Sequence, residues 1–116
     1  MPDQPAPRTL TLEIEQCNEK LTIVRCHGQL VSGLTDVLHS RARPMIQANQ
    51  RIVLDLSDIT WMDSMGLGTL VGLYTSAKAA GCELQLFKIG KRVRELLGLT
   101  HLLDVFSIIG EHGVRL

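Results

Sequence analysis

The stretch IVLDLSDITWMDSMGLG, residues 52–68, decides the fold that this sequence predicts. It begins with an apolar run, residues 52–56, which lacks the alternation of a strand with one wet face, so we expect a central strand covered on both faces. Asp63 and Ser64 follow, and both are good helix caps because a short side-chain oxygen can accept from the free backbone N–H groups of a first turn. Apolar residues then recur at helical spacing: Leu67, Leu70, Val71, Tyr74 and Ala77. The stretch therefore places a serine at the start of a helix, directly after a buried strand.

The residues before this stretch predict a hairpin. Residues 10–15 alternate between apolar and polar side chains, which indicates a half-buried strand. Residues 20–27 predict a second strand, which we expect Gly28 to end. The short connection at residues 18–19 makes this pair of strands antiparallel.

A first helix can open at Ser32 and Gly33, because apolar residues from Leu34 to Ile46 fall on one side of it. Pro44 opposes a regular helix, since a proline inside a helix removes a hydrogen bond and clashes with the preceding turn. We therefore expect a kink there, or a restart with Pro44 in a first turn. The order of strand, helix and strand around this segment predicts a parallel crossover.

The residues after Asp63 predict a helix to about Ala80, a strand at 82–86, a short helix at 91–97 and a last strand at 105–108. Gly68 and Gly72 lie four residues apart, so they share one face of the first of these helices. Each glycine costs roughly 1 kcal/mol of helix stability relative to alanine. We expect close packing of that face on the sheet to compensate for this cost.

Together these elements predict an α/β fold. One mixed sheet of four to five strands would carry three to four helices, packed mainly on one face. Residues 1–8, which hold three of the four prolines, predict a disordered N-terminal tail, and residues 9–116 predict a single domain. Residues 110–116 are too few and too glycine-rich to predict a helix.

Composition argues against several classes of function. The 12 basic and 12 acidic residues balance, and one Trp, one Tyr and two Phe offer few surfaces for base stacking, so we expect no nucleic-acid partner. No apolar run approaches the ~20 residues that span a bilayer, so we expect no direct membrane insertion. The N-terminus does not have the pattern of a signal peptide. Three cysteines without CxxC spacing indicate reduced thiols in a cytoplasmic protein.

The residue patterns do not support catalysis or metal binding. Gly90-Lys91-Arg92 lacks the upstream glycine and the hydroxyl residue of a phosphate-binding loop. The four histidines have no metal-ligand spacing. Ser64 has only Asp63 beside it as a base, and it lacks the Gly-x-Ser-x-Gly elbow of serine hydrolases. We therefore assign no catalytic residue, no metal and no cofactor to this chain.

A cluster of cations surrounds the start of the predicted third helix: Lys88, Lys91, Arg92 and Arg94. A solvated helix face is the simpler explanation. Cations at a helix start nevertheless oppose the helix macrodipole, so a partner surface that carries acidic groups is the alternative explanation.

The run of residues 54–68 closely resembles the signature of anti-sigma factor antagonists, the STAS domain family. In that family a strand leads into an Asp-Ser-x-Gly-Leu-Gly turn, and the serine after the aspartate is phosphorylated. Residues 28–30, 79–84 and 93–106 also resemble family segments, so the resemblance covers residues 9–109. Two departures lie near the serine: Val31 stands where antagonists often carry Asp, and Met65 replaces a small residue.

The resemblance implies a switch of binding partners. The unmodified protein would bind an anti-sigma factor that is also a serine kinase, and a sigma factor would be freed. The kinase would then phosphorylate Ser64 with ATP and release the antagonist, and a metal-dependent serine phosphatase would reset it. The free protein is expected to be a monomer. Its predicted partner-binding residues are Ser32, Gly33, Asp63, Ser64, Met65, Gly66, Leu67, Lys91 and Arg92.

Three other functions stay open at this point. The chain could be a STAS subunit of a membrane transporter complex, which would bind an ATPase subunit. It could instead be a scaffold of stress-signalling assemblies, which would form large oligomers. A small-molecule or nucleotide sensor is the third, although the sequence shows no phosphate cradle.

Overall fold

The computed structural model describes residues 8–48 and 50–109, with residues 107–109 described by their backbone alone. The predicted tail before Arg8 and the glycine-rich end after residue 109 lie outside this part. The elements are β1 (Leu10–Gln16), β2 (Leu21–Leu30), α1 (Thr35–Ala48), β3 (Arg51–Met62), α2 (Ser64–Ala80), β4 (Glu83–Phe87), α3 (Lys91–Leu99) and β5 (Ser107–Ile109). Their order is the one that the sequence predicts.

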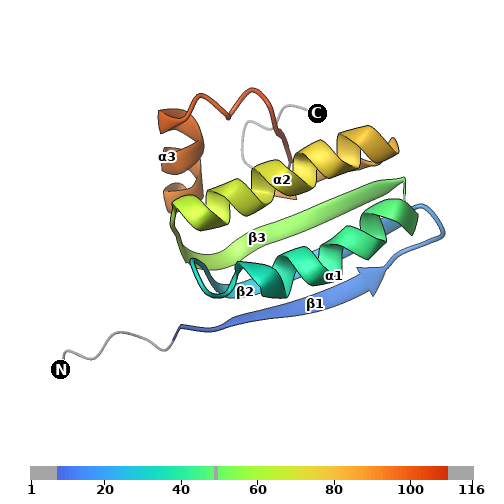
Figure 1. Ribbon diagram of the computed structural model, residues 1–116, viewed down its shortest axis with the longest axis horizontal. Helices are drawn as coiled ribbons and strands as arrows, with labels where there is room; N and C mark the ends of the chain where they lie inside the picture. The colour runs from blue at the N-terminus through green and yellow to red at the C-terminus, as the bar shows by residue number, and fades with distance from the viewer. Residues whose placement is uncertain (1–7, 49, 110–116) are drawn as a thin grey trace.

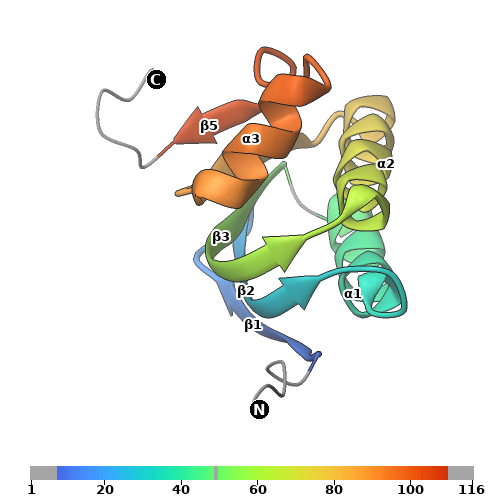
Figure 2. The ribbon, with the colours of Figure 1, turned by 90° about the vertical axis from the view of Figure 1, so that its left-hand side faces the viewer.

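The strands form one mixed sheet of five strands in the order β1-β2-β3-β4-β5. β1 and β2 are antiparallel, and the remaining neighbours are parallel. Figure 1 shows α1 and α2 side by side over the sheet, and Figure 2 shows both helices on the same face. α3 lies at the end of the sheet where β3 leads into α2. The predicted α/β class, the mixed sheet and the placement of the helices mainly on one face are confirmed.

The core lies between the sheet and the pair of helices α1 and α2. Three consecutive residues of β3 are buried, Ile52, Val53 and Leu54, which confirms that this strand is buried whichever way its side chains point. Burial of each such side chain contributes about 1.5–3 kcal/mol to folding. Fully buried side chains from α1 and α2 complete this core: Leu38, Ile46, Leu70 and Leu73.

Both central strands are longer than the sequence predicts. β2 continues past Gly28 to Leu30, and β3 continues through its polar residues to Met62. The two extensions pair with each other, Gln29 with Trp61 and Leu30 with Met62, after irregularities in register. The prediction ended β3 where its polar residues begin. These residues continue the strand because they lie on a sheet face that neither α1 nor α2 covers.

Gly28 permits a close approach between strands and does not end one. Its φ is +117°, a conformation that side chains disfavour, and an added Cβ would lie 2.1 Å from the carbonyl oxygen of Thr9. The prediction that Gly28 ends β2 is therefore wrong. The glycine lets the start of β1 close onto β2 while the ladder between β2 and β3 runs on.

Helix α1 also differs from the prediction. It begins at Thr35, because residues 32–34 form a turn in which Gly33 has a φ of +91°. The helix then runs through Pro44 to Ala48 without restarting. Packing of the buried Leu38, Ala42 and Ile46 against the core outweighs the hydrogen bond that the proline removes.

Candidate functional site

The site is the turn at which β3 ends and α2 begins. Asp63 has an extended backbone, φ −110° and ψ −173°, and its Oδ1 accepts a hydrogen bond of 3.0 Å from the backbone N–H of Gly66. This is the geometry of a helix N-cap. The prediction that Asp63 caps the turn is therefore confirmed, whereas Ser64 is the first residue of the helix itself.

The second oxygen of Asp63 reaches another element. Its Oδ2 accepts a hydrogen bond of 2.9 Å from the backbone N–H of Ser32, in the turn between β2 and α1. One carboxylate thus joins the start of α2 to the loop that holds Ser32 and Gly33. Ser32 and Asp63 are 31 residues apart, so no local pattern in the sequence pointed to this bond.

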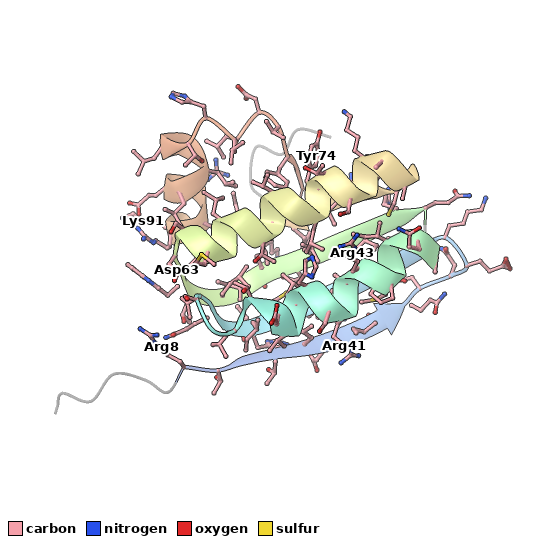
Figure 3. The ribbon with its side chains drawn as sticks, in the orientation of Figure 1. Arg8, Arg41, Arg43, Asp63, Tyr74 and Lys91 are labelled. Atoms are coloured by element: carbon pink, nitrogen blue, oxygen red, sulfur yellow. The ribbon has the colours of Figure 1, made fainter. Side chains whose placement is uncertain are left out.

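These contacts set the charge of Asp63. Burial alone would raise the pKa of its carboxyl, but the backbone N–H groups of Ser32, Gly66 and Met65 stabilise the carboxylate, and the pKa lies below its ordinary value. The site therefore holds a fixed negative charge beside Ser64 at neutral pH. Figure 3 labels Asp63 at this end of the molecule.

Ser64 and Met65 form the exposed part of the turn. Ser64 is exposed, and Met65 is 56% exposed although its side chain is large and apolar. Both border a groove of about 360 Å³ between α1 and α2. The other residues that line it are Thr35, Asp36, His39, Gly68, Thr69 and Gly72. The hydroxyl that the sequence singled out therefore lies in the open, next to an exposed apolar side chain.

Gly66 and Leu67 belong to the core. Gly66 is buried, and an added Cβ would lie 2.1 Å from the carbonyl oxygen of Leu30. Leu67 is only 8% exposed. Their side of α2 therefore packs on the sheet, and a partner would meet Ser64 and Met65 in place of these two residues.

The other two glycines of α2 do not pack as predicted. An added Cβ would find no atom within 4 Å at Gly68 or at Gly72. The expected close packing of this face on the sheet is therefore wrong. Both glycines border the open groove, and Gly66 is the one that gives α2 its close contact.

The start of α3 brings two predicted residues to the same end of the molecule. Lys91 is exposed, and Figure 3 labels it at the end that also holds Asp63. Arg92 reaches β3: its Nε donates a hydrogen bond of 3.2 Å to the carbonyl oxygen of Met62, and its guanidinium carbon lies 4.0 Å from the centre of the Trp61 ring. Trp61 is not among the residues that the sequence predicts to bind a partner. The available signal was a single large aromatic residue at the end of a polar segment, three residues before Ser64.

The described residues hold no group of His, Cys, Asp and Glu side chains that could bind a metal. None of the described helices is long and apolar enough to cross a membrane. Cys17 is exposed, Cys26 and Cys82 are buried, and all three are free thiols. The arrangement thus offers an accessible hydroxyl, an adjacent carboxylate and a surface around them.

Known proteins resemble this chain in sequence and in fold. The family model for the STAS domain matches residues 12–113. An anti-sigma-B factor antagonist from Bacillus subtilis is 29% identical, over 91% of this chain and 98% of its own length. An anti-sigma F factor antagonist from Paenibacillus polymyxa is 30% identical, over 85% of this chain and 87% of its own. The structure of the antagonist SpoIIAA in its unphosphorylated form matches with a TM-score of 0.74 at 18% identity, over 89% of this chain and 91% of that one.

Proposed function

We propose, because the chain belongs to the STAS domain family, that it is an anti-sigma factor antagonist whose binding is switched off by phosphorylation of Ser64. The observation that carries the proposal is the exposed Ser64 at the first position of α2, beside the capping carboxylate of Asp63. The two relatives described above carry the name of anti-sigma factor antagonists and cover almost the whole domain. This assignment is favoured over a transporter subunit, a scaffold or a ligand sensor for the same reason.

In the proposed cycle the unmodified protein binds an anti-sigma factor that is also a serine kinase. Ser64 and Met65 supply the exposed centre of the contact, with Ser32 and Gly33 beside them and Lys91 and Arg92 at its edge. Formation of this complex frees the sigma factor. The binding takes place in the cytoplasm, and the free antagonist is a monomer.

The kinase then transfers a phosphoryl group. The Ser64 oxygen attacks the γ-phosphorus of the ATP that the kinase holds, ADP leaves, and the serine proton is lost. This chain supplies only the hydroxyl and its position, so it needs no catalytic residue and no cofactor. A serine phosphatase later hydrolyses the phosphoserine and restores the binding form.

Phosphorylation changes the surface and leaves the fold in place. It adds about −1.5 to −2 charges at pH 7 to a turn that already carries the Asp63 carboxylate. The N-terminal end of α2 stabilises a nearby anion by about 0.3–1 kcal/mol, so the helix remains. A partner that docks on the apolar Met65 then meets a large dianion, and the loss of complementary contact weakens binding.

The proposal is tested in two steps. Intact-mass analysis of the protein from its native cells should find one added phosphoryl group, which a Ser64→Ala variant lacks. The kinase that co-purifies with Ser64→Ala should bind this variant and fail to bind Ser64→Asp. Ser40→Asp, at an exposed position of α1, controls for the added charge and should bind like the wild type. A chain that carries no phosphate even in cells without the phosphatase, and Ser64→Asp that binds unchanged, would contradict the proposal.

A further inference from the structure

Trp61 is an exposed side chain and not a core residue. It is the single tryptophan of the chain, and it is 48% exposed although it lies in the central strand β3. Its neighbour Met62 is fully buried, so the strand itself is well packed at this point. An exposed tryptophan costs solubility, and tryptophan is among the residues that contribute most to binding at protein interfaces.

The exposed ring has a cation fixed over it. The guanidinium carbon of Arg92 lies 4.0 Å from the centre of the Trp61 ring, and the Nε of Arg92 donates to the carbonyl oxygen of Met62 at 3.2 Å. An arginine side chain that is free in solution loses rotamer entropy when a partner immobilises it. Here the fold of α3 against β3 has already restricted it.

Within the described part of the chain, no acid neutralises the charge of Arg92. Among the residues that the structure describes, no carboxylate lies within ion-pair distance of it, whereas Arg25 on β2 pairs with Glu15 at 2.8 Å and with Asp55 at 3.9 Å. Arginine carries five N–H donors, and the Met62 carbonyl accepts from Nε alone. The terminal nitrogens of Arg92 can therefore donate hydrogen bonds to both oxygens of a carboxylate.

We propose that Trp61 and Arg92 together form a receptor for a carboxylate side chain of the anti-sigma factor, and that this contact adjoins the one at Ser64. The inference rests on the proposed function and names the chemistry of the partner: one Asp or Glu that pairs with Arg92, next to apolar surface that covers the indole of Trp61. The surface of Trp61 and Arg92 is continuous with the exposed part of the Ser64 turn. Met62, whose carbonyl holds Arg92, directly precedes the Asp63–Ser64 turn, and the exposed Met65 extends the apolar surface beyond it.

The test measures affinity by calorimetry, with the purified kinase that phosphorylates Ser64 as the probe. Trp61→Ala and Arg92→Gln should each weaken binding by tenfold or more, as expected for the removal of an interface anchor. Arg92→Glu should bind still more weakly because it repels the partner's acid. Arg92→Lys should fall between the wild type and Arg92→Gln, since lysine keeps the charge but lacks the planar fork.

Arg25→Gln is the matched control, because it removes an arginine whose charge is already paired within the sheet. It should bind within twofold of the wild type. Urea unfolding of each variant checks that the fold is kept. Fluorescence of Trp61 gives a second readout: emission of the wild type should shift to shorter wavelength when the kinase covers the ring.

The outcomes separate this inference from the proposed function. Suppose that Ser64→Asp abolishes binding while Trp61→Ala and Arg92→Gln bind within twofold of the wild type. The proposed carboxylate receptor is then wrong, and the proposed phosphorylation switch is kept. The receptor is also wrong if Arg25→Gln weakens binding as much as Arg92→Gln does. If the wild type and Ser64→Asp bind the kinase equally, the proposed function fails, and the inference that rests on it fails too.

Discussion

At the scale of single residues, Asp63 makes two bonds that the sequence predicts only in part. Its role as a cap follows from the local pattern, because a short acidic side chain before a helical run accepts from that helix. The bond to Ser32 joins residues that are distant in the chain, so it depends on the finished sheet. The same holds for Trp61 and Arg92, which come together only when α3 packs at the end of β3.

This double role predicts the effect of removing the carboxylate. Asp63→Ala should lower the free energy of unfolding by about 1–3 kcal/mol, because the helix loses its cap and the Ser32 N–H loses its acceptor. Asp63→Asn should cost less, since one amide oxygen still accepts. Urea unfolding measures both. Asp36→Ala, in the first turn of α1, is the control, and a loss there as large as that of Asp63→Ala would contradict the argument.

At the scale of elements, the sequence predicts the type and order of the helices and strands better than their extent. Hydrophobic periodicity identifies β1, α2 and α3, since the apolar residues of each recur on one face. It fails where an element is held by its neighbours: the polar end of β3 pairs with residues 27–30 of β2, and α1 tolerates Pro44 because its apolar side is buried. Periodicity also cannot tell which glycine of α2 contacts the sheet.

The three glycines of α2 predict opposite effects of the same substitution. Gly68→Ala and Gly72→Ala should each raise the free energy of unfolding by up to about 1 kcal/mol, because alanine favours the helix and nothing lies in its way. Gly66→Ala should lower it, because the new Cβ would clash with the Leu30 carbonyl. Thermal and urea unfolding of the three variants decides this. Destabilisation by Gly68→Ala or Gly72→Ala would contradict the prediction, because it would mean that other atoms already fill the groove between α1 and α2 where the new Cβ would lie.

At the scale of the whole molecule, charged side chains tie three strands together on the sheet face opposite α1 and α2. The ring of His27 on β2 contacts Glu13 on β1 and Asp58 on β3, each at 2.7 Å. Beside it, Arg25 contacts Glu15 on β1 and Asp55 on β3. Such rows of contacts pair the charged side chains of a sheet face that has no covering layer. The sequence shows these residues but not their register, so this network could not be predicted.

The His27 contacts predict how stability depends on pH. Hydrogen bonds to Asp58 and then to Glu13 raise the pKa of His27 above its ordinary value of 6.5. Since the folded state binds the proton more tightly than the unfolded state, this stabilisation is full below the unfolded pKa, about 6.5. It is lost as pH rises through the folded pKa. The difference in the free energy of unfolding between the wild type and His27→Gln should therefore shrink as pH rises above about 6.5.

Urea unfolding of the two proteins over a series of pH values measures this difference directly. Subtraction removes the titration of groups that both proteins share, apart from their coupling to His27. Glu13 and Asp58, which contact the ring, are the nearest such groups, and Arg25, Glu15 and Asp55 lie beside them. A second pair, wild type and His39→Gln, controls for the loss of an imidazole that has no ion pair among the described residues. A difference for His27→Gln that stays constant or grows with pH would show that the protonated ring does not hold β1 and β3 together.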